Sequence, residues 1–240
     1  MRLYGLHTVR AALDNPRRKV KRLVVTRNAL ERLEIADTAA LRFPVEMVEP
    51  REIDRILGGD AVHQGAMIEA VPLTPKRLDA LGDATLVVVL DQVTDPHNVG
   101  AVLRSAVAFG AGALITTARH SPAESGVLAK AASGALEHID HIEVRNLADA
   151  LETLHAAGFR SVGLDSEGDA EVEASLSGER IALVLGAEGK GLRQKTRETV
   201  SALARLDMPG PIRSLNVSNA AAVALYAARK FLGKRVASSE

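Results

Sequence analysis

Residues 85–92 read TLVVVLDQ, and residues 180–186 read RIALVLG. Both runs are rich in Val, Leu and Ile and are apolar almost without interruption. A strand with one solvent-facing side alternates apolar and polar residues, whereas a strand buried on both faces is a continuous apolar run. We therefore predict that these two runs are central strands of a parallel sheet with helices on both faces.

From residue 85 onward, segments typical of strands and helices alternate strictly. The further strand-like segments are residues 113–117, 141–144, 160–165 and 202–208. The helix-like segments are residues 98–111, 122–133, 146–158 and 218–233. This alternation is typical of the α/β class, so we expect an α/β domain over residues 85–240.

The first 72 residues form a smaller predicted α/β unit. Its helix-like segments are residues 4–15 and 29–42, and its strand-like segments are residues 20–26 and 62–71. Pro72, Pro75 and Gly82 then occur among charged residues, which is typical of a linker. We expect domains at residues 1–72 and 85–240, joined by a linker at residues 73–84.

Composition excludes several classes of protein and site. Of the 240 residues 47% are hydrophobic, and the mean hydropathy is +0.05, which indicates a folded globular chain rather than a disordered one. The absence of Cys excludes disulfides, thiolate metal sites and Cys nucleophiles. No apolar run approaches the roughly 18 residues that a membrane span needs, so we expect a cytoplasmic protein without membrane segments. We also expect no metal site.

The zero net charge conceals a basic N-terminal end. Residues 1–32 contain only two acidic residues but nine basic ones: Arg2, Arg10, Arg17, Arg18, Lys19, Lys21, Arg22, Arg27 and Arg32. A basic stripe is typical of a protein that binds a polyanion such as a nucleic acid. An ordinary solvated face is the alternative.

Three polar or glycine-rich loops follow predicted strands. Residues 91–100 lead into a helix that begins near Asn98 and carries Arg104, and residues 208–219 bring Ser214 and Asn216 to the start of the last helix. Residues 186–192 hold three glycines, in a spacing that matches neither dinucleotide-binding nor phosphate-binding loops. Because ligands bind at the carboxyl ends of parallel strands, we expect one shared pocket. Helix caps and structural glycines are the alternative interpretation.

Taken in order, these loops resemble three motifs of the SpoU (TrmH-like) RNA ribose 2'-O-methyltransferases of the SPOUT superfamily. The matching residues are Asp91-x-x-x-Asp95-Pro96-x-Asn98-x-Gly100-x-x-x-Arg104, Leu185-Gly186-x-Glu188-x-x-Gly191 and Met208-x-Gly210-x-x-x-Ser214-Leu215-Asn216-Val217-Ser218. Residues 4–9 and 61–65 resemble the N-terminal domain of the branch that methylates a guanosine ribose in 23S ribosomal RNA. One position differs, because Leu206-Asp207-Met208 stands where the family usually has Ile-Pro-Met.

The resemblance implies a fold, an activity and a set of site residues. The implied fold is a C-terminal domain with a deep trefoil knot and an N-terminal RNA-binding domain similar to ribosomal protein L30e. The implied enzyme is a homodimer that methylates a ribose 2'-hydroxyl of RNA with S-adenosylmethionine. The implied catalytic residues are Arg104, Asn98, Glu188, Ser214 and Asn216, and the implied cofactor-binding residues are Gly186, Leu206, Met208 and Leu215.

Other functions fit the sequence less well. A metal-dependent phosphatase could use Asp91 and Asp95, but its motif needs a spacing of two residues rather than four. A transfer RNA could be the substrate instead of ribosomal RNA. A catalytically silent RNA-binding module of the same fold is the alternative from another class, although every residue implied in catalysis is present.

Overall fold

The computed structural model describes residues 1–187, 189–212 and 214–237. The chain forms two compact units: Met1–Thr74 with Ala123–His138, and Pro75–Pro122 with Ile139–Glu240. We call them the N-terminal unit and the C-terminal unit. From the sequence we expect two domains, each formed by one continuous segment. In the structure, residues 123–138 instead pack within the N-terminal unit.

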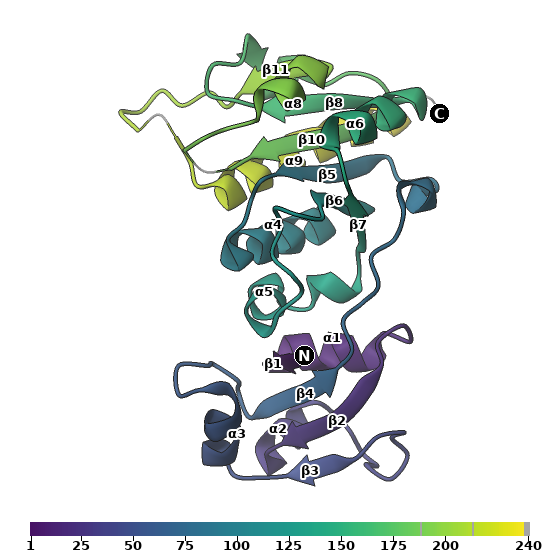
Figure 1. Cartoon of the computed structure of the whole chain (residues 1–240), viewed down its shortest axis with the longest axis vertical. Coiled ribbons are helices and arrows are strands. Elements are labelled where there is room, and N and C mark those ends of the chain that lie inside the picture. The colour runs from purple at the N-terminus through teal and green to yellow at the C-terminus, as the bar shows by residue number, and fades with distance from the viewer. Residues whose placement is uncertain (188, 213, 238–240) are drawn as a thin grey trace. The chain divides into compact units, whose positions relative to one another are not determined.

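The C-terminal unit is built on a seven-stranded sheet (Figure 1). The strand order is β7-β6-β5-β10-β8-β11-β9, and every pairing is parallel. The strands are β5 (Leu86–Asp91), β6 (Ala113–Thr117), β7 (Asp140–Val144), β8 (Phe159–Leu164), β9 (Ala170–Glu171), β10 (Arg180–Gly186) and β11 (Ala202–Arg205). The predicted α/β class with a parallel sheet is confirmed.

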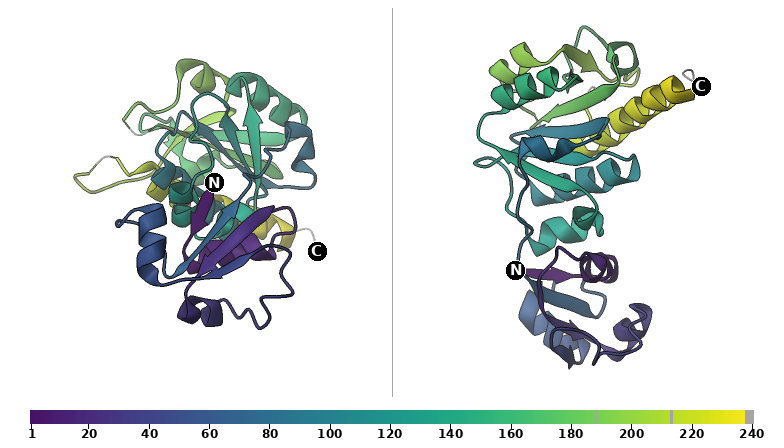
Figure 2. Two further views of the ribbon diagram at one scale, coloured as in Figure 1. Left: turned by 60° about the horizontal axis from the view of Figure 1, so that its bottom comes forward. Right: turned by 90° about the vertical axis from the view of Figure 1, so that its right-hand side faces the viewer.

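Helices cover both faces of this sheet. They are α4 (Pro96–Ala108), α6 (Leu147–Ala156), α7 (Val172–Ser175), α8 (Gln194–Thr199) and α9 (Val217–Ala237), with a 3₁₀ turn η1 (Leu78–Leu81). One face is covered by α4 and α9 and the other by α6 and α8 (Figure 2). All of β5 is buried, as is β10 from Ile181 to Leu185, because each strand packs on both faces. The prediction that these two runs are central strands is confirmed.

The residues expected to form a linker belong partly to the C-terminal unit. Lys76 pairs with Ile142 at the edge of the sheet, and its backbone N–H donates to the carbonyl of His141 at 2.7 Å. The 3₁₀ turn η1 follows, and Leu78 and Leu81 pack on the core beside α6. Only the first residues of the expected linker therefore lie outside this sheet and its core.

The N-terminal unit has a four-stranded mixed sheet in the order β1-β4-β2-β3. Its elements are β1 (Arg2–Tyr4), α1 (Leu6–Asp14), β2 (Val20–Val25), α2 (Arg27–Arg32), β3 (Val45–Met47), α3 (Pro50–Leu57), β4 (Ala66–Ala70), α5 (Gly126–Ala132) and the 3₁₀ turn η2 (Ala135–Glu137). The expected helix over residues 29–42 is wrong. Helix α2 ends at Arg32, and Glu34 has a φ of 54°, which is incompatible with a continuing helix.

A buried ion cluster holds α5 and η2 in the N-terminal unit. The side chain of Arg18 is fully buried between Glu124, at 2.6 Å, and Glu137, at 2.5 Å. Asn15 donates a further hydrogen bond to Glu137 at 2.7 Å, and Glu124 accepts one from the backbone N–H of Leu73 at 2.8 Å. Burial raises the pKa of Glu124, although the charge of Arg18 opposes this shift. The contacts of Asn15 and Arg18 with these two glutamates join residues more than 100 positions apart.

Within the residues that the structure describes, no helix is both long and apolar enough to cross a membrane.

Candidate active site

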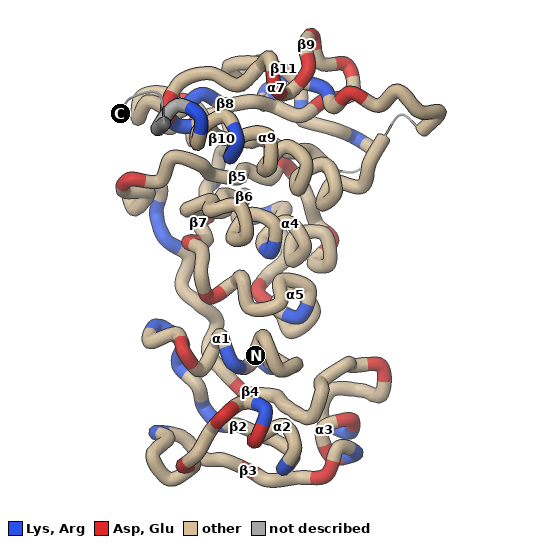
Figure 3. The backbone as a smooth tube through the Cα atoms, turned by 180° about the vertical axis from the view of Figure 1, so that it is seen from behind, with Lys and Arg blue, Asp and Glu red and all other residues tan. Residues whose placement is uncertain are grey.

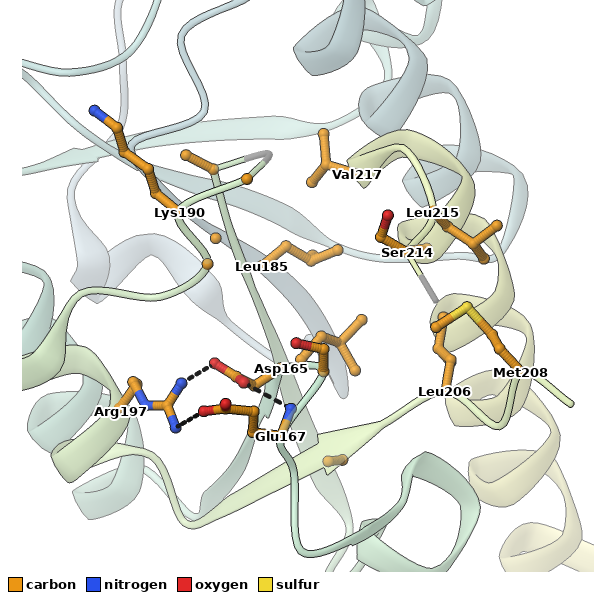
Figure 4. A pocket seen from close by; sticks show the side chains of 18 residues that line it. Asp165, Glu167, Leu185, Lys190, Arg197, Leu206, Met208, Ser214, Leu215 and Val217 are labelled. Atoms are coloured by element: carbon orange, nitrogen blue, oxygen red, sulfur yellow. Dashed lines mark hydrogen bonds and ion pairs between the residues drawn. The ribbon is translucent and has the colours of Figure 1, made fainter. Parts of the chain in front are cut away.

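A cavity of about 410 Å³ opens at the carboxyl ends of β8, β10 and β11 (Figure 4). Its described lining residues are Leu164, Asp165, Ser166, Glu167, Leu185, Gly186, Ala187, Gly189, Lys190, Gly191, Arg197, Ala204, Leu206, Met208, Ser214, Leu215, Val217 and Ala220. Figure 4 shows the charged group of Asp165, Glu167 and Arg197 on one side and the apolar side chains of Leu206 and Met208 on another. The volume lies within the range of small-molecule sites.

The glycine-rich loop after β10 forms one wall of this cavity. It doubles back on itself, because the N–H of Gly191 donates to the carbonyl of Ala187 at 2.9 Å. A Cβ atom at Gly186 would lie 2.1 Å from the carbonyl carbon of Gly191, so only glycine fits there. Gly186, expected to bind the cofactor, lines the cavity, and the close approach of Gly191 explains why this position is a glycine. Glu188, expected to be catalytic, lies outside the described residues.

The loop before α9 supplies the opposite wall. Leu206, Met208 and Leu215, all expected to bind the cofactor, line the cavity together with the expected catalytic residue Ser214. Asp207, which departs from the family pattern, is exposed and is not among the lining residues. The acidic substitution is thus accommodated beside the cavity, with its side chain in solvent.

The first loop is joined to the third through side-chain amides. Asn216 donates from Nδ2 to Oδ1 of Asn98 at 3.0 Å. Oδ1 of Asn216 accepts from the backbone N–H of Ser218 at 2.8 Å and from its hydroxyl at 2.6 Å. Asp95 caps α4, because its Oδ1 accepts from the N–H of His97 at 3.0 Å. Asn98 and Asn216 are therefore brought together next to Ser214, although neither is among the residues that line the cavity.

Arg104 stands apart from both groups. It lies on α4, its side chain is exposed, and it forms no hydrogen bond or ion pair with any residue that the structure describes. It is also not among the cavity-lining residues. The guanidinium of Arg104 can therefore bind an anionic ligand without first breaking a contact within the described part of the chain.

The cavity wall that follows β8 was not predicted from the sequence. Asp165, Ser166 and Glu167 line the cavity there, and Arg197 of α8 contacts both carboxylates. The available signal was that Asp165 directly follows a strand-like segment, as Asp91 ends another. Arg197 carried no signal, because nothing in a short polar helix distinguishes a cavity residue from a solvated one.

Several basic residues of the N-terminal end are paired with acidic neighbours (Figure 3). Arg22 pairs with Glu46 and Glu69, each at 2.9 Å, and holds the pKa of Glu69 below its usual value. Arg2 pairs with Glu69, Arg10 pairs with Glu34, and Arg18 is buried. Lys19 and Lys21 are exposed and form no ion pair with any described residue. The basic residues expected to form a stripe are therefore divided between side chains that are paired or buried and side chains that are exposed.

Comparison with known proteins supports the motif assignment. The model of the SpoU rRNA Methylase family matches residues 85–226, and the model described as RNA 2'-O ribose methyltransferase substrate binding matches residues 2–76. A 23S rRNA (guanosine-2'-O-)-methyltransferase RlmB of Pseudomonas putida is 40% identical, over 95% of each chain. The protein of the same name from Pseudomonas aeruginosa is 38% identical, over 94% of each chain. The crystal structure of an AdoMet-bound rRNA methyltransferase from Sinorhizobium meliloti has a TM-score of 0.78 at 27% identity, over 96% of this chain and 87% of that one.

Proposed function

The chain belongs to the SpoU rRNA methylase family, and from this we propose that it methylates the ribose 2'-hydroxyl of a guanosine in 23S ribosomal RNA. The observation that carries the proposal is a 40% identity that extends over 95% of both chains to a relative of that name. The name shared by several relatives, 23S rRNA (guanosine-2'-O-)-methyltransferase, favours this substrate over a transfer RNA.

The cavity suits S-adenosylmethionine. An adenine needs an apolar slot, and Leu206, Met208 and Leu215 supply apolar surface beside Gly186. The charged amino-acid end of the cofactor needs polar partners, and Ser166, Glu167 and Lys190 supply polar groups elsewhere on the cavity wall. When bound, the cofactor supplies a methyl group on a positively charged sulfur.

The chain's own task is to position the ribose and to assist loss of a poorly acidic proton. Arg104 holds a phosphate of the RNA and stabilises negative charge on the 2'-oxygen, because a guanidinium offers several donors in a planar fork. It is a poor base, since its ordinary pKa lies above about 12. Asn98, Asn216 and Ser214 orient the reacting groups, and Glu188 completes the set.

The N-terminal and C-terminal segments of the chain have different functions. The segment of residues 1–72 binds RNA and has a fold similar to ribosomal protein L30e, and the segment of residues 85–240 binds the cofactor and contains a deep trefoil knot. Exposed Lys19 and Lys21 are suited to phosphate contacts, whereas Arg22 is already paired. A cytoplasmic location follows from a ribosomal RNA substrate.

The protein acts as a homodimer through α4 and α9. Val223 and Tyr226 of α9 are 46% and 53% exposed, and the ring of Tyr226 lies 6.0 Å from that of Phe109 at the end of α4. An exposed apolar face of this kind is typical of an association surface. Sedimentation of the wild type and of Tyr226→Glu tests the dimer, and an unchanged mass would refute this surface.

The function is tested on 23S ribosomal RNA from a deletion strain. We expect one guanosine to lose its 2'-O-methyl group and to regain it when purified protein and S-adenosylmethionine are added. The cofactor should also raise the melting temperature of the protein by mass action. Full methylation of 23S ribosomal RNA in the deletion strain, with a new unmethylated ribose in a transfer RNA, would assign the alternative substrate.

A further inference from the structure

Two buried carboxylates flank the strand that leads into the glycine-rich loop. In the sheet, β10 lies between β5 and β8. Gly186, the last residue of β10, is paired in register with Asp91 of β5. On the other side, Leu185 is paired with Leu164, and Asp165 is the next residue of that chain segment. The side chains of Asp91 and Asp165 are 0% and 5% exposed.

Each carboxylate holds an arginine from the segment that follows the loop. Arg193 donates to Asp91 twice, from its backbone N–H at 3.0 Å and from Nε at 2.7 Å. Arg197, four residues later, forms an ion pair with Asp165, whose second oxygen accepts from the backbone N–H of Glu167 at 2.9 Å. Figure 4 shows the contact of Arg197 with Asp165 at the edge of the cavity. A carboxylate buried without such a partner would be costly, so each of the two carboxylates favours the fold in which its arginine is in place.

The loop between these anchors depends on them for its shape. Its two ends touch, since Gly186 and Gly191 are in close backbone contact. Apart from hydrogen bonds inside the loop, its course depends on where β10 ends and where the chain is fixed again, at Leu192, which is buried in the core, and at Arg193. The same loop supplies Gly186, Gly189 and Lys190 to the cavity wall. Loss of the Arg193 side chain removes one of the anchors after the loop, and we therefore expect the shape of that wall to be less well defined.

We propose that Asp91 and Asp165 are positioning residues that act through Arg193 and Arg197, and that together they hold the glycine-rich loop in the shape that binds the cofactor. The proposal rests on the proposed function, because it assigns S-adenosylmethionine to this cavity. It gives Asp91, the first residue of the first motif, a role that is neither metal binding nor contact with substrate.

The test uses the full-length protein and replaces the arginines, because their side chains are 43% and 33% exposed and their loss leaves no cavity in the apolar core. Each variant also leaves a buried carboxylate without its partner, so its melting temperature is measured alongside its affinity for the cofactor. We expect Arg193→Ala and Arg197→Ala each to raise the Kd for S-adenosylmethionine at least about tenfold, as measured by calorimetry. With saturating cofactor, kcat should change less than about threefold, since the reacting groups are untouched. Arg193→Lys should recover part of the affinity, because the ammonium keeps the charge while losing the donor geometry of Nε.

Arg180 provides the matched control. It lies at the opposite end of β10, where it donates to the carbonyls of Gly82, Ala84 and Ala157 and stacks on Phe159. Arg180→Ala should lower the melting temperature without changing the Kd for the cofactor. If it weakens cofactor binding as much as Arg193→Ala does, the effect is general destabilisation and the proposal is wrong.

A measurement without cofactor separates this proposal from the proposed function. Hydrogen exchange of the free protein should be faster at the amides of Gly189, Gly191 and Leu192 in Arg193→Ala than in the wild type. A wild type that binds no S-adenosylmethionine would overturn the proposed function, even if exchange in the loop responds as expected. A wild type that binds it, with variants unchanged in both exchange and Kd, would overturn the positioning role alone.

Discussion

Replacement of Arg104 by Ala isolates the catalytic step from folding and from cofactor binding. Because the side chain is exposed and has no partner among the described residues, its loss should change the free energy of unfolding by less than about 0.5 kcal/mol. Because Arg104 is not among the cavity-lining residues, the Kd for S-adenosylmethionine should be unchanged. If it positions phosphate and stabilises the 2'-oxygen, the rate should fall about 100-fold, which corresponds to about 2.7 kcal/mol of transition-state stabilisation.

The assay is single-turnover methylation of 23S ribosomal RNA at saturating RNA and cofactor, paired with calorimetric titration of the cofactor. Arg104→Lys should restore little of the rate, because an ammonium lacks the planar fork of donors. Arg160→Ala is the matched control, since Arg160 is likewise exposed but lies at the start of β8, far along the strand from the cavity edge. A full rate in Arg104→Ala would remove this residue from the mechanism and leave Asn98 or Ser214 as the next candidates.

Three further predictions concern stability and RNA binding. Glu137→Gln should destabilise the N-terminal unit by about 3 kcal/mol in chemical denaturation, because it leaves the buried charge of Arg18 undercompensated; a change within error would refute this. Joint replacement of Lys19 and Lys21 by Gln should weaken RNA binding and reduce its salt slope by about 1 to 2, and an unchanged slope would show that these lysines contact no phosphate. Burial and the positive charge of a neighbouring arginine lower the pKa of His155, so the folded state binds fewer protons than the unfolded state, and the free energy of unfolding should fall as the pH drops below about 6.5. A His155→Gln variant should lose part of that pH dependence, and an identical pH profile would contradict the assignment.

The local sequence pattern was sufficient to predict the parallel sheet and the edge of the sheet at which the site lies. The apolar run of β5 identifies a strand buried on both faces, because such a strand has no solvent-facing positions to fill with polar residues. The carboxyl-edge rule then placed the glycine-rich loop and the loop before α9 around one cavity, and the structure brings Gly186 and Ser214 to it. Both inferences rest on periodicity within one segment and on the geometry common to all parallel sheets.

The charge pattern in the sequence did not predict which charged side chains are exposed and which are buried in ion pairs. Arg18 was predicted to lie on a basic face, yet it is buried between two carboxylates more than 100 residues away in the chain. The same contacts place residues 123–138 in the N-terminal unit, although α5 follows a strand of the C-terminal sheet and has an ordinary helical pattern. A charged residue has the same local signature whether it is solvated or paired.

What the sequence by itself determined is therefore the class of fold, the family and the edge of the sheet where the site lies. Only the tertiary structure decided which charges are available to a ligand and which hold the protein together. Asp91 and Asp165 became recognisable as partners of Arg193 and Arg197 once the strand order placed β5 and β8 on either side of β10. The physical reason is that hydrophobic burial follows a period within one segment, whereas an ion pair depends on the distance between two segments that only the folded chain sets.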